Sequence, residues 1–153
     1  MGKSKLEMLL WSIALPGFGQ LLNKKYIKGI VLLLLEIVVN VQSKLNVVII
    51  LSFQGDIGSA IEETNYQWLM FYPCLYFFAM WDAFKDAKGK TPDFSFFPFV
   101  FSAFSMTLGV IYSSKLELLG ILLGPVFLPL LFIIPGLFVG FLISKLFKHT
   151  TGY

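Results

Sequence analysis

A glutamate inside an apolar segment is the side chain best suited to chemistry in this sequence. Glu36 follows a run of leucines and lies seven residues after Gly29, about 10 Å along a helix. Helical spacing places Asn40, Ser43 and Lys44 on the same face as Glu36. Because carboxyl groups are rare inside membrane helices, this polar stripe predicts a polar-ligand site, a proton relay, or hydrogen bonds that lock helices together.

A second candidate site combines residues that break helices with lysines. It consists of Pro16, Gly17, Gly19, Lys24, Lys25 and Lys28. Proline removes a backbone donor and glycine permits positive φ, so the chain can turn sharply while the lysines stay at the lipid headgroups. The segment predicts either a simple turn or a backbone nest that holds an anion or a lipid phosphate. A dinucleotide fingerprint is excluded, since a third glycine and a preceding strand are missing.

A third candidate lies where acids and lysines alternate, in residues 81–90. Trp81, Asp82 and Asp86 form a predicted docking loop for a cytoplasmic partner. The alternative is a solvated helix end, in which the two aspartates pair with Lys85, Lys88 and Lys90.

Small residues recur at four-residue intervals in the second half of the chain. Membrane helices approach closely through such residues, because lipid provides no hydrophobic force between helices. This pattern predicts helix contacts within the chain, a homo-oligomer or a membrane-protein partner, through Gly109, Gly120, Gly124, Gly136 and Gly140.

Composition excludes several classes of function. One cysteine and one histidine, His149, leave no set of metal ligands and no catalytic dyad, so we expect a protein without cofactor, metal or catalytic residues. All twelve basic residues are lysine, whereas nucleic-acid recognition relies on arginine, so no nucleic-acid partner is expected. The chain is 57% hydrophobic and 14% charged, which is typical of a protein embedded in a lipid bilayer.

Apolar runs define the elements that must position these residues. Four runs are candidates for spans: 27–41, with a continuation to 53, then 66–81, 96–112 and 118–147. The segment 6–22 is short and contains Pro16, so it predicts a re-entrant or interfacial helix rather than a span or a cleaved signal. We therefore predict an all-α fold in one integral membrane domain over residues 1–153, a multi-pass transmembrane helix bundle of four spans plus this short helix. As a straight helix, the run 118–147 would measure roughly 45 Å, so it must tilt, kink or double back as a hairpin.

The lysines predict the orientation. With four spans, ten lysines fall on one side of the membrane and only Lys44 and Lys115 fall on the other. The positive-inside rule then places both termini in the cytoplasm, and we expect a bacterial cytoplasmic membrane.

One part of the sequence resembles a known family. The segment Leu15-Pro16-Gly17-Phe18-Gly19-Gln20-Leu21-Leu22, with Tyr26, Lys28-Gly29 and Trp81-Asp82-Ala83, is similar to the two-transmembrane ("TM-two") domain family. The resemblance implies a TM-two-like part over about residues 8–83, to which this chain adds helices in 94–147. Asn23-Lys24-Lys25 departs from the family pattern, which has an aromatic-tyrosine pair there. The Pro-Gly-x-Gly-Gln segment also resembles the amino-terminal part of some sugar-importer permeases.

Two functions are consistent with these patterns. The first is a non-enzymatic interaction protein, an accessory subunit that contacts other membrane proteins. The second is a binder or transport component for a small polar molecule or lipid, which would use the stripe around Glu36.

Overall fold

The computed structural model describes residues 4–150, which form nine α-helices and one short β-hairpin. The helices are α1 (Lys5–Ala14), α2 (Phe18–Leu22), α3 (Tyr26–Ser43), α4 (Leu45–Phe53), α5 (Ile57–Glu63), α6 (Tyr66–Leu69), α7 (Tyr72–Asp86), α8 (Phe97–Tyr112) and α9 (Gly124–Thr150). The hairpin pairs β1 (Glu117–Leu118) with β2 (Ile121–Leu122) in antiparallel register. The prediction of an all-α fold is confirmed.

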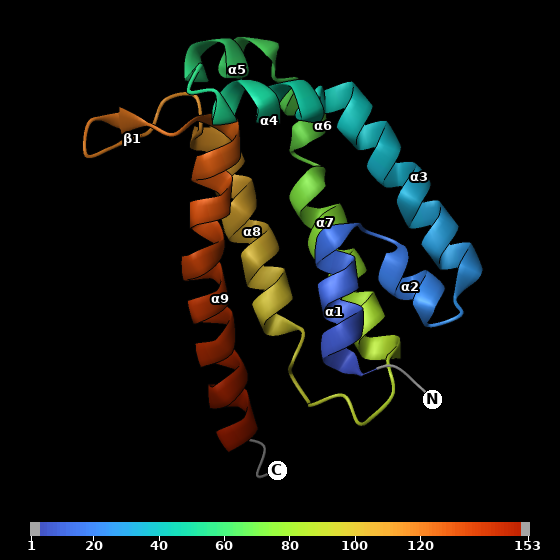
Figure 1. Ribbon diagram of the computed structural model, residues 1–153. Helices are drawn as coiled ribbons and strands as arrows, with labels where there is room; N and C mark the ends of the chain where they lie inside the picture. The colour runs from blue at the N-terminus through green and yellow to red at the C-terminus, as the bar shows by residue number, and fades with distance from the viewer. Residues whose placement is uncertain (1–3, 151–153) are drawn as a thin grey trace.

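Four long helices run along the length of the molecule (Figure 1). These are α3, α7, α8 and α9, while the short helices α4, α5 and α6 lie across the upper end. At the lower end, α1 and α2 pack beside α7, and the two chain termini lie at this end as well. The N-terminal segment is therefore a helical hairpin that packs against α7 and α3.

Local sequence explains where the helices start and stop. The Ser4 hydroxyl accepts a hydrogen bond from the backbone N–H of Glu7 at 3.1 Å, which is half of a capping box at the start of α1. Gly17, with φ of 101°, reverses the chain between α1 and α2. Asp56 caps α5, and hydrogen bonds from the Ser59 hydroxyl and N–H hold the pKa of its carboxyl below the ordinary value.

The apolar run 27–53 forms two helices rather than one. Lys44 adopts a left-handed conformation, with φ of 58°, which ends α3 and starts α4 in a new direction. The continuation to Phe53 therefore does not lengthen the first helix but crosses the upper end of the molecule.

The run 118–147 also differs from a simple span. Its first residues form the β-hairpin, and a single helix of 27 residues, α9, follows, so the helical-hairpin alternative is wrong. Gly120 is not a helix contact: it lies in the turn of this hairpin with φ of 77° and open space around it. Gly124 begins α9, and a Cβ atom there would meet the Ile57 side chain of α5.

The remaining three glycines lie where α8 packs against α9. A Cβ atom built on Gly109 would lie 2.6 Å from Cα of Pro129, and one on Gly140 would lie 2.5 Å from Cα of Pro98. Gly136 faces the backbone of Phe101 at a similar distance. These helices touch backbone to backbone, as small residues in membrane helices allow.

The outer surface of the long helices is apolar. Large hydrophobic side chains are exposed along one side of α3 and along α9, among them Ile27, Leu34, Ile134 and Phe138. By length and composition, α3 and α9 can each cross a membrane, and only 28% of the most apolar window of each is buried. A core helix of a soluble protein would be mostly buried, so this exposure indicates a membrane location.

Candidate functional site

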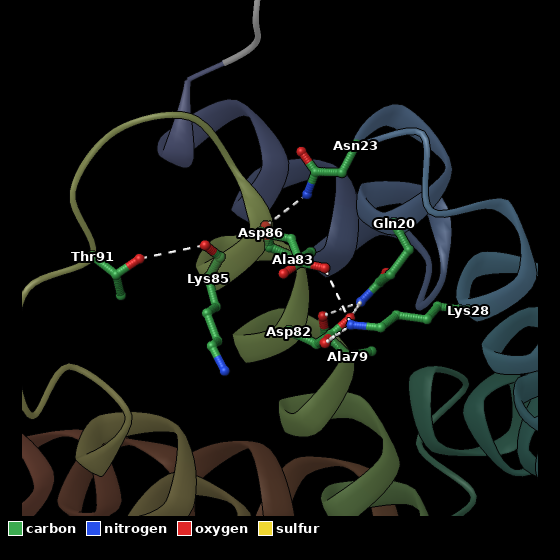
Figure 2. A network of polar contacts seen from close by, with 9 residues as sticks. All are labelled: Gln20, Asn23, Lys28, Ala79, Asp82, Ala83, Lys85, Asp86 and Thr91. Carbon is green, nitrogen blue, oxygen red and sulfur yellow. Dashed lines mark hydrogen bonds and ion pairs between the residues drawn. The ribbon is translucent and has the colours of Figure 1, made fainter.

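A polar cluster joins the N-terminal hairpin and α3 to the end of α7 (Figure 2). The Lys28 ammonium donates to Asp82 Oδ1 at 2.6 Å and to Asp86 Oδ2 at 3.1 Å. The buried Gln20 amide donates to Asp82 Oδ2 at 3.1 Å and to the Ala79 carbonyl at 2.8 Å. Asp82 thus binds two side chains from two different helices.

Two further residues satisfy the last carbonyls of α7. The Asn23 amide donates to the Ala83 carbonyl at 2.8 Å, and the Lys5 ammonium donates to the Phe84 carbonyl at 2.9 Å. Lys5 also lies over the Phe84 ring, 4.9 Å from its centroid. A cation at the C-terminal end of a helix is favourable for the helix dipole, so this cluster fixes α7 to the amino-terminal segment.

The proline and glycines of the predicted turn are buried in the protein rather than exposed at its surface. Pro16, Gly17 and Gly19 are buried, and a Cβ atom on Gly17 would lie 2.6 Å from the carbonyl oxygen of Gly29. Because these residues are covered by α3 and α7, the predicted backbone nest is not open to a headgroup phosphate. Lys24 and Lys25 are exposed, while Lys28 is held by the two aspartates.

The predicted docking residues are also placed differently. Trp81, Asp82 and Asp86 lie in the last turns of α7 and not in a loop. The ion pairs of both aspartates join them to Lys28, more than 50 residues away, instead of to the lysines of their own helix. The reason is that both carboxyl groups face α3 across a partly buried contact.

The polar stripe of α3 divides into two parts. Glu36 and Ser43 are buried on one face, at 6% and 0% exposure, whereas Asn40 is half-buried and bonds with Asn46. Lys44 is not part of the stripe: the left-handed turn carries it outward, where it pairs with Glu63 at 2.7 Å.

Glu36 faces a cavity of about 250 Å³ in the centre of the bundle. The tip of the N-terminal hairpin, residues 13–16, closes one side, and α3, α4, α6, α7, α8 and α9 supply the rest. Ile13 and Leu130 line the cavity and are also 45% and 49% exposed, so side chains of α1 and α9 belong both to the cavity wall and to the apolar outer surface.

Three polar side chains face this otherwise apolar space. Tyr72 lines the cavity beside Glu36. Tyr76 stacks on Tyr72 with 5.7 Å between ring centroids, and its hydroxyl donates to the Ile13 carbonyl at 2.8 Å. Glu36 Oε2 is buried and has no hydrogen-bond partner among the described residues. An apolar cavity with few convergent polar groups is the usual form of a small-molecule site.

The sequence identified one of these three polar residues. Glu36 is recognisable because it is a carboxyl in an apolar run, whereas Tyr72 and Tyr76 are not among the candidate residues that the sequence predicts. Their i, i+4 spacing on α7 indicates a shared face, yet only the packing of α7 against α3 shows that this face meets Glu36.

Comparison with known proteins does not identify this arrangement. No family model, no curated protein and no solved structure matches the chain. The similarity to the TM-two family therefore stays a prediction, but the residues that carry it are neighbours in the structure: Gly17, Gly19 and Gln20 pack against Gly29, Asp82 and Ala83.

Proposed function

We propose that this protein is a non-enzymatic, multi-pass membrane protein that binds a small, mostly apolar molecule in the Glu36 cavity. The observation that carries the proposal is a buried carboxyl oxygen without a partner, facing a space of about 250 Å³. A buried polar group normally has a hydrogen-bond partner, since an unpaired one costs roughly 1–3 kcal/mol. A bound molecule would supply the partner that the described chain does not.

In this proposal, the chain crosses the membrane four times, through α3, α6–α7, α8 and α9, with α1–α2 as a re-entrant hairpin. The distribution of charge supports this arrangement. The lysine-rich segments at the start of α3 and after α7 lie at the end that holds both termini, and Asp56 and Glu63 lie at the opposite end. The positive-inside rule then favours cytoplasmic termini in a bacterial cytoplasmic membrane.

The geometry favours a binder over an accessory subunit. Asp82 and Asp86 are engaged within the chain, and Gly109, Gly136 and Gly140 lie in the contact between α8 and α9. These five residues, which the sequence predicts for contact with another protein, thus have intramolecular roles. Glu36, which the sequence predicts for ligand binding, faces a cavity.

A small photoreactive probe tests this function. We expect 3-(trifluoromethyl)-3-phenyldiazirine, a neutral apolar compound, to label Leu69 when the protein is irradiated in membrane vesicles. Leu69 is 3% exposed and lines the cavity, whereas Leu128 is 0% exposed and does not, so lipid-dissolved probe reaches neither directly. Mass spectrometry of the digested protein locates the label.

Two phenylalanine substitutions provide the matched comparison. Val110→Phe adds ring atoms at a wall of the cavity and should abolish labelling of Leu69, whereas Val139→Phe, on the exposed side of α9, should leave it unchanged. Equal labelling of Leu69 and Leu128, or labelling that Val110→Phe does not reduce, contradicts the proposal.

A further inference from the structure

The polar end of the cavity has the composition of a cation site. Glu36 is the only acidic residue that lines it, and no lysine or histidine is among the described residues of its wall. The other lining residues are apolar apart from Tyr72 and Tyr76. A carboxylate here would therefore have no protein cation to neutralise it.

The two tyrosines add a second feature that favours a cation. Their rings are stacked at an interplanar angle of 21° beside the glutamate. Aromatic faces attract ammonium groups, and this attraction is strongest where water is excluded. Because the Tyr76 hydroxyl donates its hydrogen bond to the Ile13 carbonyl, this side chain would contact the ligand through the face of its ring.

The size of the cavity limits the rest of the ligand. A cavity of about 150 Å³ lined by apolar side chains holds benzene. The space of about 250 Å³ observed here has room for one ring or a short branched chain together with an amino group. Four prolines from three segments line it and leave gaps in the helix packing that a compact apolar group can fill: Pro16 before α2, Pro73 in α7, and Pro125 and Pro129 in α9.

We infer that the Glu36 cavity binds a small organic ammonium ion, with the charged nitrogen at the Glu36 carboxylate beside Tyr72 and the apolar part toward α8 and α9. This inference rests on the proposed function, since it names the class of ligand that the same cavity takes. Because Ile13 of α1 and Leu130 of α9 belong both to the cavity wall and to the apolar outer surface, the path between these two helices is the route by which such an amphipathic amine would enter from the lipid phase.

Competition against the photoreactive probe tests the inference. Phenethylammonium, 2-phenylethanol and phenylacetate each have a phenyl ring that carries two further carbon atoms. The first is a cation, the second is neutral and the third is an anion. We expect phenethylammonium to prevent labelling of Leu69 at a concentration about 10- to 100-fold lower than 2-phenylethanol, the range expected for one charge-assisted hydrogen bond. Phenylacetate should compete least, because its carboxylate would face Glu36.

Two glutamine substitutions separate the role of Glu36 from a general effect of charge. Glu36→Gln keeps the shape of the side chain and should bring the amine and the alcohol within about twofold of each other. Glu62→Gln, an exposed residue of α5, should leave the preference for the amine unchanged. Parallel measurement of Leu69 labelling without competitor shows that each variant still has the cavity.

The outcomes distinguish this inference from the proposed function. If Leu69 is labelled but the amine competes no better than the alcohol, or if Glu36→Gln retains the preference, the cavity binds small molecules but is not an ammonium site. If Leu69 is not labelled in any variant, the proposed function itself fails.

Discussion

Two aspartates one helical turn apart in α7 differ in how much of the structure depends on them. Asp82 accepts hydrogen bonds from the Gln20 amide and the Lys28 ammonium, and its side chain is 12% exposed. Among residues 4–150, the Asp86 carboxylate has one ion pair, with Lys28 at 3.1 Å, and its side chain is 21% exposed. Removal of Asp82 takes one of two acceptors from the Gln20 amide and the shorter of two ion pairs from Lys28, whereas removal of Asp86 leaves the shorter ion pair of Lys28 intact.

We therefore expect Asp82→Ala to lower the free energy of unfolding by about 1–3 kcal/mol and Asp86→Ala by about 0–1 kcal/mol. Unfolding by sodium dodecyl sulfate in mixed micelles, followed by tryptophan fluorescence, measures the difference. If both variants lose the same free energy of unfolding, the hydrogen bond between Gln20 and Asp82 contributes little to stability. Because Asp82→Ala lowers stability, a defect of this variant in cells is evidence for a binding partner only if it exceeds the effect of the lost stability.

At the scale of the residue, the sequence predicted types of chemistry better than partners. Glu36 could be found because a carboxyl in an apolar run is unusual, and the Gly17–Gln20 turn because its residues break helices. The partners of Lys28 could not be found, because helical spacing favours Lys85 for Asp82 and Lys90 for Asp86. Only tertiary packing brings α3 close enough to compete.

At the scale of the elements, the most extensive contact between two helices in the structure is that of α8 with α9. Pro129 and Pro135 lie inside α9, where each removes a backbone donor. The Ser105 hydroxyl of α8 donates to the Phe132 carbonyl of α9 at 2.6 Å, so a side chain of one helix bonds with the backbone of the other between these prolines. The glycines permit this approach because they place no side chain between the two backbones.

Gly140→Ala should therefore destabilise the protein by about 1–3 kcal/mol, because the added methyl group would overlap the backbone of Phe97 and Pro98, which cannot rotate away. The control is Gly58→Ala in α5, whose Cβ atom would meet only Asp56 Oδ1 at 3.9 Å. There, alanine should be neutral or stabilise by up to about 1 kcal/mol, since glycine is a poor helix former. The same detergent titration compares them, and a stable Gly140→Ala variant would contradict the close packing of α8 and α9.

Element boundaries were less predictable than the presence of helices. The apolar runs located α3, α7, α8 and α9, but Lys44 and Gly120 were assigned to helices although both have positive φ. Lysine rarely adopts this conformation, so composition contains no sign of the break at Lys44. Apart from Glu117, the strands of the hairpin before α9 consist of leucine and isoleucine, and an apolar run of these residues does not distinguish strand from helix.

The molecule as a whole separates its charges along the axis of the long helices. A helix of 27 residues such as α9 measures about 40 Å, so its ends extend beyond a hydrocarbon core of about 30 Å. Lys24, Lys25 and Lys90 belong to turns at the end with both termini, and Glu62 and Glu117 belong to the opposite end. A transmembrane orientation in which the lysine-rich end faces the cytoplasm satisfies both the length and the charge.

Cysteine labelling tests this orientation and the re-entrant hairpin together. In a Cys74→Ser background, single cysteines replace Ser4, Lys25 and Lys90 at one end and Glu62 and Glu117 at the other, all of which are exposed. A membrane-impermeant maleimide applied to intact cells should label only the cysteines at positions 62 and 117, while those at 4, 25 and 90 should react only after permeabilisation. If position 4 reacts from outside and position 25 does not, α1–α2 crosses the membrane and the hairpin is not re-entrant. If all five positions react alike in intact cells, the four-span arrangement is wrong, because the two ends of the bundle would then lie on the same side of the membrane.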